Sequence, residues 1–345
     1  MVGRSSRSAR LARALALVVA LFAALTLAAC GSSDSDDSTT SSGGGAAATT
    51  DDGGGGELTA VKMGVVPAAT FAPVFVGLEQ GFFRRHGIDL QIEVGGLAPT
   101  VFPRILKNQL QLGANTWGTL VTAREQGLPL TGIAPVDHGG TTPEDDYQGI
   151  IAKPGGVRTL AELEGKTVAV PTLKSFTDSQ VRSVLKEAGV DVDSVRFIAI
   201  PFPDVPAALK AGRVDAAGVV EPFFSQAKAD GGTPLASLSR EQLMGAIVAA
   251  EKFVEDDPDT VRKFQEAWAE TLRYATDNPD AVRAALTRGL RIPEAVASRM
   301  TLPIWQETTD EAKVQEIADM MLDVGAVSRE IDARSMITPF PLPAS

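Results

Sequence analysis

The stretch that decides the fold reads Ala72-Pro73-Val74-Phe75-Val76-Gly77-Leu78-Glu79-Gln80-Gly81-Phe82-Phe83-Arg84-Arg85-His86-Gly87-Ile88-Asp89-Leu90. Its first part, residues 72–80, is typical of a helix, and Gly81 ends that helix because glycine accepts the left-handed backbone that closes helices. From residue 88 to 94 apolar and polar residues alternate, which predicts a half-buried strand. An apolar run at residues 61–66 predicts the strand that precedes the helix and stops at Pro67.

The same alternation of strands and helices continues to about residue 200. Helical patterns cover residues 101–109, 116–126 and 176–188. Short strand patterns cover residues 110–114, 131–136, 149–152, 167–170 and 194–200. Strands that alternate with helices of this length indicate βαβ units and mostly parallel sheets, so we predict an α/β fold.

Two polar segments divide this α/β region. Residues 141–146 are polar and contain Pro143, and residues 237–245 are the second such segment. We interpret both as crossings between two lobes, so residues 58–142 plus 245–345 form lobe I and residues 143–244 form lobe II. About 288 residues are enough for two lobes with separate cores.

A similarity between two segments of the sequence supports two similar lobes. Residues 105–113 and 208–217 both read as a helix end, a turn and a short strand. Asn108 and Gly212 occupy the turns, and both residue types tolerate a positive φ. The C-terminal part is helical from Glu251, with helices that begin near Pro258 and Pro279.

The N-terminus carries four arginines and no acid, followed by an uncharged apolar run at residues 14–29. This pattern predicts a secretory signal at residues 1–29, since the run is shorter than the ~20 residues of a membrane-spanning helix. The end of the run, Leu27-Ala28-Ala29-Cys30-Gly31, resembles the lipobox of bacterial lipoproteins, which implies lipidation of Cys30 and an extracytoplasmic, membrane-anchored protein. The alternative is an ordinary secretory peptide with an incidental cysteine.

Residues 30–57 are rich in Gly, Ser, Thr, Ala and Asp, which predicts a disordered tether. The net charge is −11, and it becomes −15 once the four arginines of the signal are removed. An acidic chain of this kind argues against nucleic-acid binding, which needs a basic face. Cys30 is the only cysteine, so the mature fold has no intrachain disulfide.

The stretch at residues 72–90 resembles the nitrate/sulfonate/taurine group of ABC-importer solute-binding proteins, which includes thiamine-pyrimidine binders. Residues 160–170 and 212–223 resemble the same group. One departure is that Asn108 and Gln111 stand where that group usually has Gly-x-x-Asp. The resemblance is carried by residues 61–232 and is weak in the C-terminal helices.

This resemblance implies a two-lobed periplasmic-binding-protein type II fold, in which each lobe is a mostly parallel sheet flanked by helices and a two-segment hinge joins the lobes. It further implies that a small polar molecule, anionic or zwitterionic and sulfonate-, nitrate- or taurine-like, binds in the cleft. The partners that it implies are that ligand and the transmembrane subunits of an ABC permease. We expect a monomer without cofactor or metal.

In open α/β sheets, ligands bind beside the carboxyl ends of the strands, where loops and helix N-termini meet. Applied to this sequence, the rule selects five short segments, one after each of five predicted strands. The predicted ligand-binding residues are Thr70, Phe71, Asn115, Thr116, Trp117, Asp137, Lys174, Ser175, Phe176, Thr177 and Glu221.

The segment from Thr172 to Asp178 joins a strand to a helix. Its free backbone N–H groups, together with Lys174, Ser175 and Thr177, suit an oxyanion such as a sulfonate or carboxylate. The alternative is a capping arrangement in which Ser175 is the N-cap and Asp178 stands three residues later. The two interpretations are compatible.

Other candidates also have structural alternatives. Trp117 fits the core as well as the cleft, Glu221 fits the first turn of a helix, and Phe71 fits packing between lobes. His86 and His138 are the only histidines; we expect His86 to be exposed and His138 to face solvent in a loop.

Three functions compete at this stage. The first is binding without chemistry, in which the lobes close on a solute and dock on a permease. The second is an enzyme on the same fold, of the thiamine- or menaquinone-pathway type. No Cys nucleophile and no spaced His/Glu metal motif supports it, and we predict no catalytic residues. The third is a surface sensor or adhesion module, which the tether permits.

Overall fold

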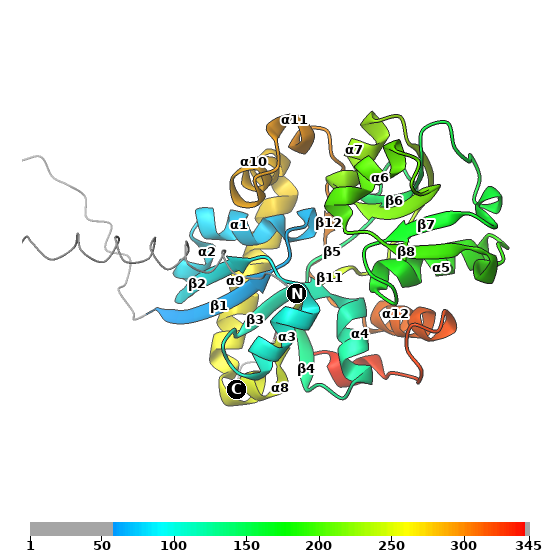
Figure 1. Cartoon of the computed structure of the whole chain (residues 1–345). Helices are drawn as coiled ribbons and strands as arrows, with labels where there is room; N and C mark the ends of the chain where they lie inside the picture. Colours follow the sequence, from blue (N-terminus) through cyan, green and yellow to red (C-terminus); the bar gives the residue numbers. More distant parts are fainter. Residues whose placement is uncertain (1–57, 342–345) are drawn as a thin grey trace, which may run out of the picture. The chain divides into compact units, whose positions relative to one another are not determined.

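The computed structural model describes residues 58–341, and two five-stranded sheets carry the fold (Figure 1). The predicted signal peptide, the tether and Cys30 lie outside the described residues. The first sheet has the strand order β2-β1-β3-β11-β4. Its strands are β1 (Thr59–Val65), β2 (Ile88–Val94), β3 (Leu112–Thr116), β4 (Leu130–Pro135) and β11 (Gly245–Ala250).

Helices cover both faces of the first sheet, because its strands alternate apolar side chains between two cores. In β11, Ile247 and Ala249 face one cluster while Ala246 and Val248 face the other. The first cluster packs under α1 (Ala72–Glu79), α2 (Phe82–Arg85), α9 (Pro258–Asp277), α10 (Pro279–Leu290) and α11 (Glu294–Ala297). The second packs under α3 (Ala98–Leu106), α4 (Trp117–Glu125), α12 (Glu311–Asp323) and η5 (Ala333–Met336).

The second sheet has the strand order β10-β6-β9-β7-β8. Its strands are β6 (Gln148–Ala152), β7 (Thr167–Val170), β8 (Arg196–Ala199), β9 (Ala216–Val220) and β10 (Thr233–Ser237). Two smaller apolar clusters lie on its two faces. Its helical segments are η2 (Ala161–Leu163), α5 (Phe176–Glu187), η3 (Val192–Ser194), η4 (Phe202–Asp204), α6 (Val205–Lys210) and α7 (Phe223–Ala229).

The remaining described elements are short. They are η1 (Ala69–Phe71), α8 (Glu251–Asp256) and the two-stranded ribbon of β5 (Asp137–His138) with β12 (Ile304–Trp305). The α/β fold predicted from the sequence is confirmed. No helix that the structure describes combines the length and apolar character that a bilayer crossing requires.

The sheets are mixed because one strand in each runs against its neighbours. The chain leaves the first sheet after β4 and enters the second through β6, which pairs antiparallel with β9 and β10. It returns through β11, which pairs antiparallel with β3 and β4. Both crossings leave one sheet at the carboxyl edge of its parallel strands and enter the other sheet at the same kind of edge. A strand that enters from that edge must run opposite to the rest.

The turns anticipated from the sequence are present. Gly81 has φ 72° at the junction of α1 and α2, as the helix-ending role requires. Asn108, with φ 54°, precedes β3, and Gly212, with φ 67°, precedes β9. The similarity between residues 105–113 and 208–217 therefore reflects the same helix–turn–strand geometry.

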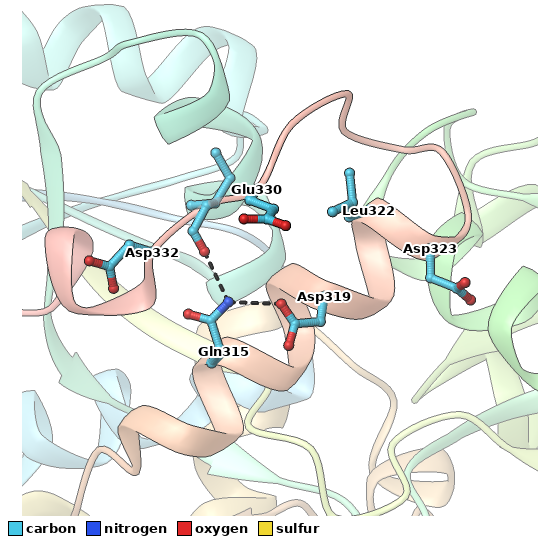
Figure 2. Close-up of a pocket in the computed structure, with 7 residues that line it drawn as sticks. Gln315, Asp319, Leu322, Asp323, Glu330 and Asp332 are labelled. Carbon is cyan, nitrogen blue, oxygen red and sulfur yellow. Dashed lines mark hydrogen bonds between the residues drawn. The ribbon is translucent and has the colours of Figure 1, made fainter.

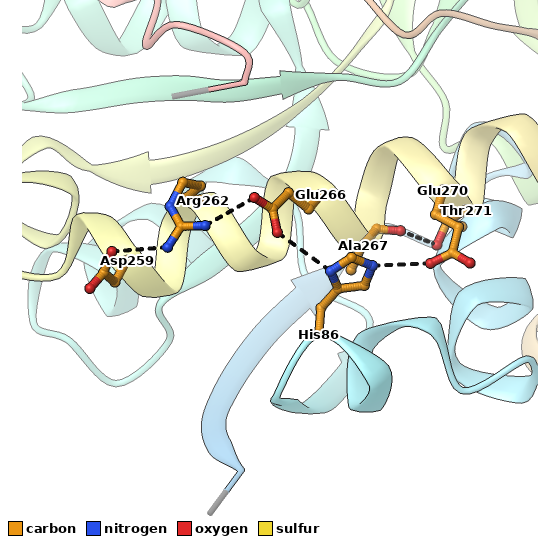
Figure 3. A network of polar contacts seen from close by, with 7 residues as sticks. All are labelled: His86, Asp259, Arg262, Glu266, Ala267, Glu270 and Thr271. Atoms are coloured by element: carbon orange, nitrogen blue, oxygen red, sulfur yellow. Dashed lines mark hydrogen bonds and ion pairs between the residues drawn. The ribbon is translucent and has the colours of Figure 1, made fainter. Parts of the chain in front are cut away.

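His86 is not the exposed residue that we expected. Its ring is half-buried, with Nε2 3.1 Å from Glu270 Oε2 and Nδ1 3.5 Å from Glu266 Oε2 (Figure 3). Arg85 also pairs with Glu270, at 2.6 Å. These acids stand four residues apart on α9, so the turn after α2 is held against one face of that helix.

Helix α12 contacts helices of both lobes, α4 and α5, although the sequence prediction assigned it to lobe I. Lys186 on α5 pairs with Asp323 at the end of α12, 2.6 Å apart. Phe176 at the start of α5 belongs to the apolar cluster of the first sheet. The first residue of α5, a helix of the second sheet, therefore packs into the apolar core of the first sheet.

Candidate ligand-binding site

A cavity of about 610 Å³ lies between the two sheets, beside the carboxyl ends of their parallel strands. Thr70 and Phe71 follow β1, Thr116 ends β3, Lys174 follows β7 and Glu221 follows β9. Each of these strands ends at the same edge of its sheet, so side chains distant in sequence converge there. The volume is within the range of small-molecule sites, ~300–1,000 Å³.

Most of the residues predicted from the sequence line this cavity. Those that do are Thr70, Phe71, Asn115, Thr116, Lys174, Ser175, Phe176, Thr177 and Glu221. Asn115 and Thr116 are the last residues of β3 and not part of a loop, since the strand begins and ends two residues later than the sequence suggested. Phe176 reaches the cavity while packing against Gly118 of α4, so it also joins the two lobes.

Trp117 does not line the cavity. It lies in the core, which was the alternative prediction for this residue. The side chain is fully buried, and the edge of its ring lies over Gly132 of β4. Trp117 is the first residue of α4, and its backbone N–H bonds the Met244 carbonyl at 3.0 Å. The start of α4 is thus fixed beside β11, and the indole turns into the apolar cluster under the sheet.

Asp137 lies behind the cavity wall and does not line it. Its carboxyl is fully buried, and Oδ1 accepts a hydrogen bond from the Gly245 N–H at 2.9 Å. Burial raises the pKa of Asp137 to about 7, while the neighbouring hydroxyls of Tyr147 and Thr70 oppose that rise. Asp137 therefore links Gly245, the first residue of β11, to Tyr147 and Thr70, which line the cavity.

The segment that opens α5 shows the capping arrangement. Ser175 Oγ accepts from the Asp178 N–H at 3.2 Å, and Asp178 Oδ2 accepts from the Lys174 N–H at 2.6 Å. Asp178 is buried and pairs with Arg182 at 2.8 Å. Lys174 has φ 60° and an exposed side chain, which places its ammonium at the rim of the cavity.

Glu221 is a buried carboxyl at the cavity, 1% exposed. Oε1 accepts from the Ser225 hydroxyl at 2.5 Å and from the Thr301 N–H at 3.3 Å, and Oε2 accepts from the Ser225 N–H at 3.0 Å. Burial raises the pKa of Glu221, and the hydrogen bonds from Ser225 counter part of that rise. Its oxygens thus cap the start of α7 and also reach a segment that follows α11.

Three residues that line the cavity, Asn115, Tyr147 and Gln148, keep side-chain polar atoms buried behind its surface. The Tyr147 hydroxyl lies beside the Asp137 carboxyl and the Thr70 hydroxyl, and burial there raises the pKa of Tyr147.

Sequence reasoning missed Tyr147 and Gln148, which directly follow the first crossing. The signal that could have found them is the crossing itself, because a chain that passes between lobes must pass the cleft. The apolar part of the wall was also missed. It includes Leu97, Phe102, Phe202 and Met244.

A second hollow, of about 730 Å³, lies between α12 and the segment before η5 (Figure 2). Gln315 Nε2 donates to Asp319 Oδ1 at 2.8 Å and to the Ile331 carbonyl at 3.0 Å. Asp323, at its edge, is paired with Lys186. None of the predicted ligand-binding residues lines this hollow.

Solved structures of other proteins share this fold. A periplasmic aliphatic sulphonate binding protein from Escherichia coli superimposes with a TM-score of 0.69 at 18% identity, covering 81% of this chain and 97% of that one. A periplasmic nitrate-binding protein from Synechocystis PCC 6803 has a TM-score of 0.67 at 16% identity, covering 81% and 85%.

Sequence comparisons extend over most of the described residues. A Brachyspira hyodysenteriae protein, provisionally named an ABC transporter periplasmic binding protein, is 25% identical over 241 residues, which are 65% of this chain and 67% of that protein. Residues 68–282 match the family described as NMT1/THI5 like, and this match spans more than half of the chain. The chain belongs to the NMT1/THI5-like family.

Proposed function

We propose that this protein is the solute-binding component of an ABC importer. It captures a small polar molecule in the cavity between its two sheets and delivers it to the transmembrane permease. The observation that carries the proposal is a cavity of about 610 Å³, suited to a small molecule, at which residues from the strand ends of both sheets meet. The likeness to periplasmic binding proteins for sulphonate and nitrate adds support.

Closure of the lobes would enclose the ligand. In this proposal residues 58–142 plus 245–345 move as lobe I and residues 143–244 as lobe II. The hinge consists of the two segments between β5 and β6 and between β10 and β11. Both segments border the cavity, since Tyr147 and Met244 belong to them and line it.

The same proposal treats the protein as a binder and not as an enzyme. Native mass spectrometry of the purified protein after incubation with a bacterial metabolite extract tests both parts. We expect a one-to-one complex with a small molecule that is released with its mass unchanged. Release of a chemically altered molecule would favour the enzyme. The absence of any complex would contradict the binding function.

We further propose that the protein is an extracytoplasmic monomer, anchored through lipid on Cys30. The support is the basic and apolar N-terminus that ends in Leu-Ala-Ala-Cys. In a bacterium that processes lipoproteins, the Cys30→Ser variant should leave the membrane fraction, whereas the unmodified chain should remain in it. Mass spectrometry of the mature N-terminus should show a diacylglyceryl group on Cys30. An unmodified cysteine there would contradict the anchor.

A further inference from the structure

We infer that Leu97 and Leu173 form an apolar gate at the mouth of the cavity, which shuts when the two side chains meet across it. This inference rests on the proposed function, since it names the contact that retains a captured solute. Three observations carry it: the exposure of both leucines, their origin on different sheets, and the different backbones that hold them.

Both leucines are exposed although both line the cavity. Leu97 is 58% exposed and Leu173 is 48% exposed, so they stand where the cavity opens to solvent, at its mouth. The structure describes three further large apolar side chains that are exposed, Val94, Leu106 and Ile304, and none of these lines the cavity. Single exposed apolar side chains are ordinary on a protein surface, whereas two that share one cavity indicate a state in which each covers the other.

The two leucines come from different sheets. Leu97 follows β2 of the first sheet and precedes α3, whereas Leu173 follows β7 of the second sheet and precedes α5. Their neighbours on the cavity wall are also apolar, with Ala98 and Pro99 beside Leu97 and Pro171 near Leu173. Movement of the two sides toward each other therefore removes apolar surface from water, which favours the closed gate.

The backbone before Leu97 permits movement. Gly95 has φ 115° and Gly96 has φ 85°, values that residues with a side chain rarely adopt. The Gly95 N–H bonds the Val65 carbonyl at 2.9 Å, which ties the end of β2 to β1. Leu97 belongs to the start of α3 instead, since its carbonyl accepts from the Thr100 N–H at 2.9 Å. The two glycines thus form a pivot between a fixed strand and Leu97.

The backbone around Leu173 is held in place by hydrogen bonds. Asp178 Oδ2 accepts from the Lys174 N–H at 2.6 Å, and the Ser175 N–H bonds the Thr172 carbonyl at 3.3 Å. These bonds fix the turn that carries Leu173 to the start of α5. In the gate, Leu97 is the side that moves, and Leu173 is the side against which it packs.

Disulfide trapping tests the closed gate. In a Cys30→Ser background, which removes the only cysteine, Leu97→Cys and Leu173→Cys together introduce one pair of thiols. A disulfide forms only when the two Cα atoms come within ~7 Å. The protein is incubated with the bacterial metabolite extract and mildly oxidised, and the cross-linked monomer is measured by intact mass and thiol labelling. We expect the cross-linked fraction to be at least about threefold higher with the extract than without it, because a bound solute shifts the population toward the closed state.

The matched control combines Leu106→Cys with Leu173→Cys in the same background. Leu106 is exposed at the last residue of α3 and is not part of the described cavity wall, so this pair should remain without a cross-link. Equal cross-linking of the control pair overturns the gate. So does the absence of a cross-link between positions 97 and 173 in protein that native mass spectrometry shows to be loaded.

Release rates test what the gate does. Leu97→Ser and Leu173→Ser should each release the solute captured from the extract about tenfold faster, because opening the gate then exposes less apolar surface. Native mass spectrometry after transfer to solute-free buffer measures the rate, and Leu106→Ser, the control, should release at the unmodified rate. The three free variants should keep melting temperatures close to that of the unmodified protein, since each leucine is exposed there. Unchanged release from both gate variants overturns the role in retention.

Failure of the gate and failure of the proposed function are distinguishable. Absence of any complex with the extract contradicts the solute-binding function, and the gate falls with it. A loaded protein that forms no cross-link and releases its solute at an unchanged rate contradicts the gate alone and leaves the function intact.

Discussion

Asp146 and Tyr147 are neighbours in the sequence and both are buried, but their side chains bond different parts of the molecule. Asp146 accepts hydrogen bonds from the hydroxyl of Ser237 and from the N–H and hydroxyl of Ser239, the last two at 2.8 and 2.7 Å. It thereby ties the first crossing to the second. The hydroxyl of Tyr147 lies beside the Asp137 carboxyl and the Thr70 hydroxyl, and other parts of Tyr147 line the cavity.

The difference between the two residues lies in which segments their polar atoms connect. A buried acceptor whose bonds are complete holds the fold, because its donors would otherwise be buried without partners. Tyr147 instead meets the buried carboxyl of Asp137 and contributes to the cavity wall. One short segment therefore both ties the two crossings together and forms part of the cavity.

The largest expected effect is on the hinge side. Asp146→Ala removes the acceptor of four buried donors, the N–H groups of Gln148 and Ser239 and the hydroxyls of Ser237 and Ser239. We therefore expect the free energy of unfolding to fall by about 3–5 kcal/mol. Urea denaturation measures it. The control is Asp145→Ala, since Asp145 is exposed and bonds only Thr142 nearby; its loss should stay below about 1 kcal/mol. Equal losses would remove the distinction between the two neighbouring acids.

An intermediate effect is expected at Asp137, which lies between the hinge and the cavity. Its pKa is raised to about 7 by burial, so the folded protein keeps a proton that the unfolded chain releases above pH ~4. The contribution of Asp137 to stability is therefore complete at low pH and is lost as the pH rises to about 7, with a slope of up to ~1.4 kcal/mol per unit.

Asp137→Asn removes this titration while keeping an acceptor for the Gly245 N–H. Relative to the unmodified protein, the variant should gain about 2 kcal/mol of stability between pH 5 and 7. Urea titrations at both pH values measure the difference. Parallel stability curves for the two proteins would show that Asp137 is ionised when folded.

The smallest effect is expected at the rim of the cavity. Lys174→Ala should change the free energy of unfolding by less than about 0.5 kcal/mol, since the ammonium is exposed and holds no ion pair among the described residues. It should weaken any anionic ligand more than an uncharged one, which calorimetry with benzoate and benzamide would show. A large loss of melting temperature with affinity unchanged would make Lys174 structural.

The sequence predicted many residues of the cavity wall because the rule about strand ends applies to each strand separately. Ser175 and Glu221 follow predicted strands, and both line the cavity. Trp117 also follows a strand, yet its indole enters the core, since side-chain direction at a helix start depends on neighbours such as Gly132. Tyr147 directly precedes β6, which runs the other way, and the rule makes no prediction for the start of a strand.

By itself, the sequence determined the α/β class and the turns at Gly81, Asn108 and Gly212. These features depend on local periodicity and on backbone preferences, which neighbouring residues set. Only the tertiary structure decided that Asp146 bonds Ser237 and Ser239 while Tyr147 meets Asp137, and that α12 contacts both α4 and α5. Whether a buried polar atom has a partner depends on residues about ninety positions away, and no local pattern encodes that.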